Sequence, residues 1–336
     1  MIKYFNISVL IANPNILVTG GEGYIGSHLM HRLSSKQRVV VSIDNEKEKN
    51  QKTLQNGIFI KGDIADRKLV SHILKKYRID VVMHLAGLIN IKESMDNPGK
   101  YFDKNVVAGL KLLEAMRLNG VKKIMYSSSV AVYGLSVTKF IKETHQKNPI
   151  NTYGLTKKIF EELLSYYHQV HGFEYVIFRY FNVAGADWKN GLRENHRPET
   201  HLIPLTLRAL FSNTPIKIYG TDYNTPDGTC VRDYVHVIDI VKAHEKALPL
   251  LLQGKICDVF NLGSGKGHSV LEVLKECSKA ANRNPIIQKA QRRKGDSPSL
   301  VADCKKIKNF LGWEPNYKLE DIIFDTKNSF YGKDKE

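Results

Sequence analysis

The sequence predicts an α/β protein in which a doubly wound parallel sheet is joined to a smaller, mixed C-terminal lobe. The first observation is a set of short, nearly continuous apolar runs, which is typical of strands buried on both faces. The second is that longer segments with helical periodicity separate these runs, as in βαβ units. The third is a glycine-rich turn directly after the first run.

Strands and helices are expected to alternate from residue 16 onward. The expected strands are residues 16–18, 39–43, 58–60, 81–85, 124–127 and 175–178. The expected helices are residues 25–34, 67–77, 105–119 and 152–171, and Gly172 should end the last one. After residue 183 the alternation of strands and helices becomes less regular, and prolines occur in the expected loops. We therefore expect residues 1–183 to form the first domain, with 1–14 as an N-terminal extension, and residues 184–336 to form mainly an interleaved second lobe.

The composition is that of a globular chain with an unusual charge. The 336 residues are 42% hydrophobic and 25% charged, but the formal net charge is +16. The basic residues are scattered and the densest cluster, residues 291–294, is short, so a polyanionic small substrate or a solvated surface is favoured over nucleic acid. No apolar run is long enough to span a membrane.

The four cysteines lie far apart, and no Cys/His cluster has the spacing of a zinc site. The sequence therefore favours reduced thiols in the cytoplasm and predicts no metal. The first twelve residues resemble a weak signal peptide but lack the small residue that should precede its cleavage point.

The glycine turn predicts a dinucleotide site. Gly20, Gly23 and Gly26 lie between the first strand and the first helix, where they permit a tight turn and close backbone approach to a pyrophosphate. The helix N-terminus offers unpaired N–H groups to the phosphates. Asp44 ends the second strand, where a carboxylate accepts ribose hydroxyls and repels a 2′-phosphate. NAD is therefore predicted in preference to NADP.

A tyrosine–lysine pair in the predicted helix 152–171 is the candidate catalytic feature. Tyr153 and Lys157 are four residues apart, so their side chains share one helix face, and Ser129 lies 24 residues upstream of Tyr153. A free phenol, with a pKa of about 10, is a poor base at neutral pH. A nearby ammonium favours the phenolate, which can take a proton from a hydroxyl group.

In their order along the chain, these motifs resemble those of the extended short-chain dehydrogenase/reductases, and among them the UDP-glucose 4-epimerases. The resemblance runs from about residue 16 to residue 317. It rests on residues 19–26, 62–64, 84–87, 127–134, 153–157, 179–182, 220–234, 261–265, 292–296 and 311–313. It implies a Rossmann-type sheet, bound NAD, a UDP-sugar substrate and a homodimer.

The resemblance also implies a mechanism and a set of contacts. Tyr153 would remove the proton from the sugar 4-hydroxyl while a hydride leaves C4, Lys157 would hold the nicotinamide ribose and lower the pKa of Tyr153, and Ser129 would bond the 4-oxygen. The 4-keto sugar would turn over in the site and regain the hydride on its other face, so NAD stays bound. The implied cofactor contacts are Gly20, Gly23, Tyr24, Ile25, Gly26, Asp44, Asn45, Asp63, Ile64, Leu85, Ala86, Gly87, Asn105, Ser127, Tyr153, Lys157 and Phe181. The implied substrate contacts are Ser129, Tyr153, Asn182, His201, Leu202, Tyr219, Arg232, Arg293, Asp296 and Leu300.

Several alternatives stay open at this point. A dehydratase needs an acid pair after the active serine, whereas Val130 and Ala131 follow Ser129 here. His201 replaces an asparagine of the family, which leaves its phosphate contact open. Leu300 is intermediate in bulk, so UDP-N-acetylglucosamine, UDP-glucuronate and UDP-pentoses remain alternative substrates. A non-catalytic NAD-binding relative is disfavoured because the tyrosine and the lysine are both present.

Overall fold

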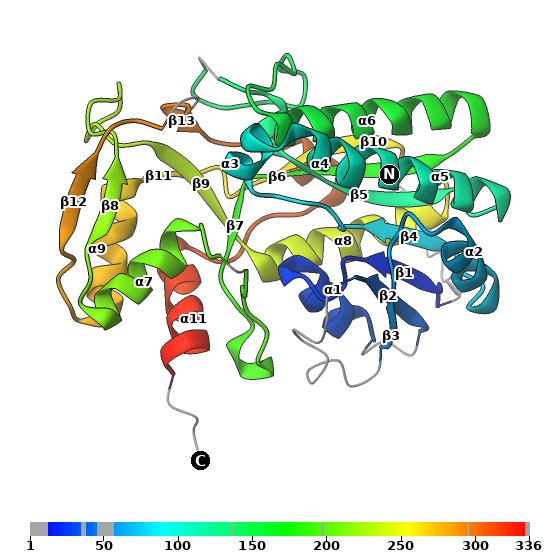
Figure 1. Ribbon diagram of the computed structural model, residues 1–336, viewed down its shortest axis with the longest axis horizontal. Coiled ribbons are helices and arrows are strands. Elements are labelled where there is room, and N and C mark those ends of the chain that lie inside the picture. Colours follow the sequence, from blue (N-terminus) through cyan, green and yellow to red (C-terminus); the bar gives the residue numbers. More distant parts are fainter. Residues whose placement is uncertain are drawn as a thin grey trace, which may run out of the picture.

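A seven-stranded parallel sheet forms the centre of the larger lobe (Figure 1). The computed structural model describes residues 13–34, 38–45, 57–135, 138–196, 198–293 and 296–332. Within them the strand order is β10-β6-β5-β4-β1-β2-β3, and every pairing is parallel. The strands are β1 (Ile16–Thr19), β2 (Val40–Asp44), β3 (Ile58–Lys61), β4 (Val81–His84), β5 (Lys123–Ser129), β6 (Glu174–Tyr180) and β10 (Asp258–Leu262). The predicted doubly wound α/β fold is confirmed.

Helices cover both faces of this sheet, which is why its strands are apolar throughout. Alternate residues of a strand face opposite sides, so Ile16 and Val18 pack into one core while Leu17 packs into the other. The first core contains residues of α1 (Tyr24–Ser34) and α8 (Val237–Leu252). The second contains residues of α2 (Arg67–Lys76), α5 (Ala108–Leu118) and α6 (Thr152–His171).

Helix α6 begins and ends as the sequence predicts. The side chain of Asn151 caps it by accepting the N–H of Gly154 at 2.8 Å, and Gly172 ends it in the left-handed conformation with φ 67°. The predicted helix 105–119 differs, because its first turn is a π-helix, η2 (Asp103–Val107), that continues into α5. Such turns are frequent at functional sites, and this one carries Asn105. Short helices α3 (Ile91–Asp96) and α4 (Pro98–Phe102) precede it.

The smaller lobe is built around two further sheets. Strands β11 (Gly267–Ser269), β9 (Val231–His236) and β13 (Ser299–Leu300) are neighbours in that order, and β7 (Asn182–Ala184) also pairs with β9. Strands β8 (Ile216–Tyr219) and β12 (Ile287–Ala290) form a separate pair. Helices α7 (Leu202–Ser212), α9 (Val270–Ala281) and α11 (Leu319–Tyr331) share one core, and α10 (Lys305–Leu311) lies further along the chain.

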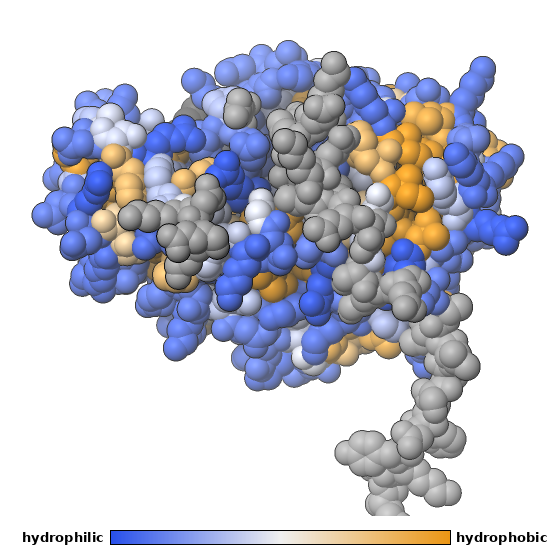
Figure 2. All heavy atoms as spheres, turned by 90° about the horizontal axis from the view of Figure 1, so that it is seen from below, coloured by the Kyte–Doolittle hydropathy of each residue, from blue (hydrophilic) through white to orange (hydrophobic). Residues whose placement is uncertain are grey.

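The two lobes exchange segments, because α8 and β10 return to the large sheet after the chain has entered the smaller lobe. Residues 1–12 of the expected N-terminal extension lie outside the described residues. Every helix in the described part of the chain is too short or too polar to cross a bilayer. On the face shown in Figure 2, hydrophilic residues predominate and hydrophobic side chains gather in smaller areas.

Candidate active site

The glycine turn is packed so closely that side chains would not fit. Gly20 has φ 73°, and a Cβ there would lie 2.8 Å from the backbone nitrogen of Ala86. A Cβ at Gly26 would lie 2.0 Å from the carbonyl oxygen of Gly20. The turn therefore lies against the segment after β4, and its backbone faces the carboxyl ends of the strands, where open α/β sheets bind ligands.

Two carboxylates lie at the same ends of the neighbouring strands. Asp44 ends β2 and accepts the N–H of Glu22 at 3.1 Å. Asp63 follows β3, accepts the N–H of Ala65 at 2.8 Å and pairs with Lys104 at 3.1 Å. Burial alone would raise the pKa of Asp63, but these two partners lower it. The carboxylate of Asp63 thus carries negative charge near the glycine turn at neutral pH.

Hydrogen bonds fix the segment after β4, which carries Leu85, Ala86 and Gly87. The Thr19 hydroxyl contacts Nδ1 of His84 at 2.7 Å and accepts the N–H of Ala86 at 3.2 Å. Asn105 bonds both backbone groups of Leu88, and its Nδ2 donates to the Thr156 hydroxyl at 3.1 Å. Thr19 and Thr156 had no role in the sequence prediction, because each acts through a partner more than fifty positions away.

Lys157 lies in a buried position between the sheet and the first turns of α6. Its ammonium donates to the carbonyl oxygen of Ser127 at 2.8 Å and lies 5.0 and 5.8 Å from the ring centroids of Tyr126 and Tyr153. Only 4% of the residue is exposed. Burial lowers the pKa of Lys157 to about 8, although the charge of Glu161 opposes this. The lysine is therefore still mostly charged at neutral pH.

The predicted direction of the Tyr153 pKa is wrong for the chain itself. Burial raises the pKa of Tyr153, and a hydrogen bond with the Ser129 side chain lowers it only in part. The ammonium of Lys157 donates its hydrogen bond to the carbonyl oxygen of Ser127 and not to the phenol. Desolvation of the phenol is therefore the largest influence on the pKa of Tyr153. A phenolate at Tyr153 thus needs more positive charge than the chain alone places beside it.

Gly154 brings Tyr153 and Ser129 together. Ser129 ends β5, and its hydroxyl accepts the N–H of Ala131 in the short helix η3 (Val130–Val132) at 3.2 Å. A Cβ at Gly154 would lie 2.4 Å from the carbonyl oxygen of Ala131. The first turn of α6 can therefore lie directly against the segment that follows Ser129 only because residue 154 is glycine.

Gly154→Ala is expected to lower kcat by about 100-fold through displacement of Tyr153 from Ser129. Alanine raises intrinsic helix stability by about 1 kcal/mol, but the clash with Ala131 must move the helix start, and a displacement of about 1 Å can cost this much in rate. The control is Gly99→Ala in α4, where a Cβ meets no atom within 4 Å. Steady-state kinetics on both variants check this, and equal activity in the two would contradict it.

Glu161 is a buried residue of the site that the sequence prediction missed. It forms an ion pair with Arg179 at 2.7 Å and accepts the Ser128 hydroxyl at 2.6 Å. Burial alone would raise the pKa of Glu161, but Arg179 and Ser128 lower it. The carboxylate thereby ties α6 to β5 and β6 behind the tyrosine–lysine pair. Its signal in the sequence is the continued spacing of four residues from Tyr153 through Lys157 to Glu161.

Strands β9 and β13 bring three of the expected substrate residues together. Nη2 of Arg232 lies 3.4 Å from Oδ1 of Asp296, and Leu300 is the register partner of Arg232. Leu300 also packs against the cluster that contains Phe181 and Val130. It therefore lies near the segment that follows Ser129, and its expected contact with the substrate stays a prediction.

The other expected substrate residues lie on neighbouring elements. The guanidinium carbon of Arg293 is 3.9 Å from the ring centroid of Tyr219, at the end of β8. Asn182 begins β7, which pairs with β9 opposite Tyr234. The expected substrate residues thus come from β7, β8, β9 and the segment 293–300, which are distant in sequence.

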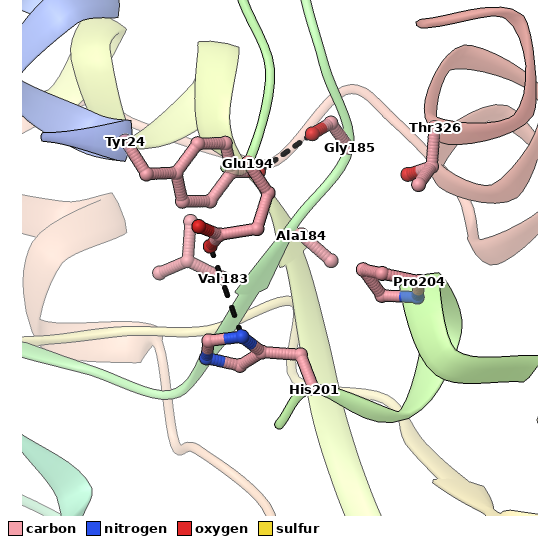
Figure 3. Close-up of a pocket in the computed structure, with 8 residues that line it drawn as sticks. All are labelled: Tyr24, Val183, Ala184, Gly185, Glu194, His201, Pro204 and Thr326. Carbon is pink, nitrogen blue, oxygen red and sulfur yellow. Dashed lines mark hydrogen bonds and ion pairs between the residues drawn. The ribbon is translucent and has the colours of Figure 1, made fainter. Parts of the chain in front are cut away.

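His201 and Tyr24 border a pocket between the lobes (Figure 3). The phenol of Tyr24 donates to the carbonyl oxygen of Gly185 at 2.6 Å, so a cofactor contact from Tyr24 would have to come from its backbone at the start of α1. Nδ1 of His201 contacts Glu199 at 2.7 Å rather than facing open space. Burial alone would lower the pKa of His201, but Glu199 and Glu194 raise it. Leu202 follows and begins α7.

The remaining expected cofactor residues lie near the carboxyl ends of the strands. Their contacts within the chain do not indicate how they would bind a cofactor. Asn45 is exposed after β2, whereas Ile64 is buried in the second core, and Ile25 packs on the first. Gly23 lies close to the Gly20 carbonyl oxygen, and Ser127 accepts from Lys157. Their positions are compatible with the expected contacts, which stay predictions.

Comparison with known proteins gives consistent matches over nearly the whole chain. The sequence profile described as "NAD dependent epimerase/dehydratase family" matches residues 16–263. A UDP-glucose 4-epimerase of Rhizobium meliloti is 43% identical over 317 residues, which cover 94% of this chain and 97% of that protein. The structure of UDP-glucose 4-epimerase from Brucella ovis in complex with NAD has a TM-score of 0.90 at 38% identity, covering 95% of this chain and 98% of that one. The UDP-Glc/GlcNAc 4-epimerase from Campylobacter jejuni has a TM-score of 0.81 at 35% identity, covering 94% and 98%.

Proposed function

Because the chain belongs to the NAD dependent epimerase/dehydratase family, we propose that it is an NAD-dependent UDP-glucose 4-epimerase, an isomerase of nucleotide sugars. The observation that carries this proposal is that the buried Lys157 lies 5.8 Å from the ring centroid of the half-buried Tyr153. Ser129 ends β5 at the same end of the sheet as the glycine turn. The similarity to UDP-glucose 4-epimerases over nearly the whole chain supports it.

The cofactor proposal is supported by the shape and charge of the turn. Side chains at Gly20 and Gly26 would clash with the neighbouring backbone, so the tight turn that can approach a pyrophosphate requires glycine at both positions. Asp44 ends β2, where a carboxylate can accept ribose hydroxyls. Lys157 would hold the nicotinamide ribose. NAD, when bound, supplies the acceptor and later the donor of the hydride, and its oxidised ring adds the positive charge that Tyr153 requires.

The residues of the chain would perform the proton transfer. Tyr153, as phenolate, would take the proton of the sugar 4-hydroxyl, and Ser129 would hydrogen-bond both the phenol and the 4-oxygen. The ammonium of Lys157 would favour the phenolate through its charge. After the 4-keto sugar turns over, Tyr153 would return the same proton to the other epimer. The cycle is then balanced in protons and electrons, so no second substrate is consumed.

The nucleotide half of the substrate would be held by the smaller lobe. Arg232 and Arg293 offer paired donors that match phosphate geometry, and Tyr219 offers a ring for the uracil. Asn182 lies on β7, the strand next to β9, and would add an amide to this group. The net charge of +16 favours approach of a polyanionic substrate.

The purified protein is expected to interconvert UDP-glucose and UDP-galactose without added NAD, because a cofactor that is regenerated in each cycle does not need to exchange. A coupled assay that detects UDP-glucose formed from UDP-galactose measures this, with heat-inactivated protein as the control. UDP-N-acetylgalactosamine, UDP-galacturonate and a UDP-pentose in parallel test the alternative sugars. Absence of turnover with every UDP-sugar would overturn the proposed function.

A homodimer is proposed through the outer face of η2, α5 and α6. These elements contact one another and leave apolar side chains exposed, namely Val107, Leu110, Leu155, Tyr166 and Val170. Exposed apolar side chains gathered on adjoining elements favour an interaction site, and two antiparallel helix pairs can bury them in a four-helix bundle. The proposed location is the cytoplasm, where the four unpaired cysteines would stay reduced.

Leu110→Lys is expected to convert the dimer into monomers, because it places a charge within the apolar face. Sedimentation velocity at several protein concentrations measures the change. The matched control is Phe310→Lys, which charges an exposed apolar residue of α10 instead. A monomeric wild-type protein, or equal dissociation in both variants, would refute the proposed dimer surface.

A further inference from the structure

The segment between β7 and α7 gathers metal-binding side chains at one point. One carboxylate oxygen of Glu194 and one ring nitrogen each of His196 and His201 all lie within 4.8 Å of one another. Figure 3 shows Glu194 and His201 facing each other across the pocket that Tyr24 and Gly185 also line. None of the three side chains is required for the proton transfer described above.

The carboxylate of Glu194 is held in place toward both imidazoles. Its side chain is 7% exposed, and Oε1 accepts the backbone N–H groups of Asn195 at 3.0 Å and of His196 at 3.2 Å. Oε1 also faces Nδ1 of His196, and Oε2 lies 3.8 Å from Nδ1 of His201. Nδ1 of His196 is a buried atom, and Oε1 of Glu194 is its ion-pair partner. One fixed carboxylate thus holds nitrogen atoms of both imidazoles beside it.

A second buried carboxylate supports the cluster. Glu199, whose side chain is 2% exposed, accepts Nδ1 of His201 at 2.7 Å. Its Oε1 also accepts the N–H of Thr200 at 2.7 Å, which fixes the orientation of the carboxylate. A carboxylate bonded to an imidazole is the arrangement that orients histidine ligands in metal sites.

The charge of the cluster also favours a cation. Over residues 138–196, 198–293 and 296–332, the ion pairs of Glu194 and Glu199 are made with imidazoles alone. Burying two carboxylates is costly unless positive charge is supplied. A divalent ion would compensate both charges at once while the histidines stay neutral.

We propose that Glu194, His196 and His201 bind a divalent transition-metal ion of the zinc class, with Glu199 orienting His201. Two imidazoles and one carboxylate are a ligand set that zinc accepts, and the fourth position would face the pocket. The sequence predicts no metal because one residue separates Glu194 from His196 and four separate His196 from His201, which matches no familiar zinc pattern. The bound ion would fasten this segment beside α1 and β7, where the two lobes meet.

The test measures metal binding by the full-length holoenzyme, prepared without a polyhistidine tag and dialysed against a chelator. Titration with Co²⁺, followed by the visible absorption of tetrahedral cobalt, should give one ion per chain, and Zn²⁺ should displace it. His196→Ala and Glu194→Gln should each weaken the affinity at least tenfold, in line with the loss of one of three ligands. The matched control is His72→Ala, an exposed histidine of α2, which should bind cobalt as the wild type does.

The variants are designed so that every result decides the proposal. Glu194→Gln keeps the shape of the side chain, so it answers the question even if His196→Ala folds poorly, and circular dichroism verifies the fold of each. Unchanged affinity in Glu194→Gln would overturn the site, as would equal weakening in His72→Ala or absence of cobalt binding to the wild type. The readout contains no sugar nucleotide, so it is independent of the proposed epimerase activity.

Discussion

Tyr153→Phe is expected to lower kcat by about 1,000-fold while NAD still copurifies with the protein. The substitution removes only the oxygen that exchanges the proton, and a positioned general base contributes about 10² to 10⁴ in rate. The aromatic ring that packs beside Lys157 is kept, so the cofactor region should retain its shape. Steady-state kinetics at saturating UDP-galactose give the rate, and absorption of the supernatant after denaturation gives the NAD content.

The control for this variant is Tyr166→Phe, which removes a hydroxyl from an exposed tyrosine three turns further along the same helix. Its kcat should match that of the wild type. Near-normal turnover of Tyr153→Phe together with loss of NAD would show that Tyr153 binds the cofactor and does not act as the base.

Lys157→Met is expected to lower kcat at pH 7 by about 100-fold and to move the acid limb of the pH profile upward by about one to three units. Methionine fills a similar volume, but it lacks the ammonium group that lies 5.8 Å from the ring centroid of Tyr153. An opposite charge at this range lowers the pKa of a partner by about one to three units. Burial already raises the pKa of Tyr153. Loss of the Lys157 charge should raise this pKa further, so the phenolate of the variant should form only at higher pH.

The alkaline limb gives a second signature of the same residue. Since burial lowers the pKa of Lys157 from 10.5 to about 8, the ammonium is present below pH 8 and is lost as the pH rises through that value. The kcat/KM of the wild type should therefore decline above about pH 8, and that of Lys157→Met should not. Lys158→Met, at the neighbouring half-buried lysine, is the control. A profile of Lys157→Met with both limbs unchanged would refute an electrostatic role.

The large sheet was predictable because its strands are buried on both faces and are therefore apolar in sequence. The bounds of α6 were predictable for a different reason, since Asn151 and Gly172 are local capping residues. The π-helix at residues 103–107 was not, because five residues are too few to reveal a change of helical period. The sequence predicts an interleaved second lobe but does not show which strand joins the large sheet, since the pairing of β10 with β6 connects segments distant in sequence.

In the candidate site too, local sequence patterns were predictable and contacts between distant segments were not. Tyr153, Lys157 and the glycine turn were found because fixed local spacings place them. The pairing of Glu161 with Arg179 and of Thr19 with His84 depends on tertiary packing, so the sequence does not show which partner each residue has. The direction of the Tyr153 pKa was predicted wrongly because a sequence shows that a lysine is near but not how completely the phenol is desolvated.

The late return of β10 to the large sheet has a consequence for how the protein is made. A chain that emerges from the ribosome completes β6 long before it supplies the outer neighbour of that strand, residues 258–262. During this interval β6 presents unpaired backbone groups and apolar side chains, the features that lead sheet edges to associate with other chains. A fragment ending at residue 183 would hold Ser129, Tyr153 and Lys157 and yet carry this open edge. The large sheet of the enzyme can therefore be completed only late in synthesis, because its last strand, β10, comes from the C-terminal part of the chain.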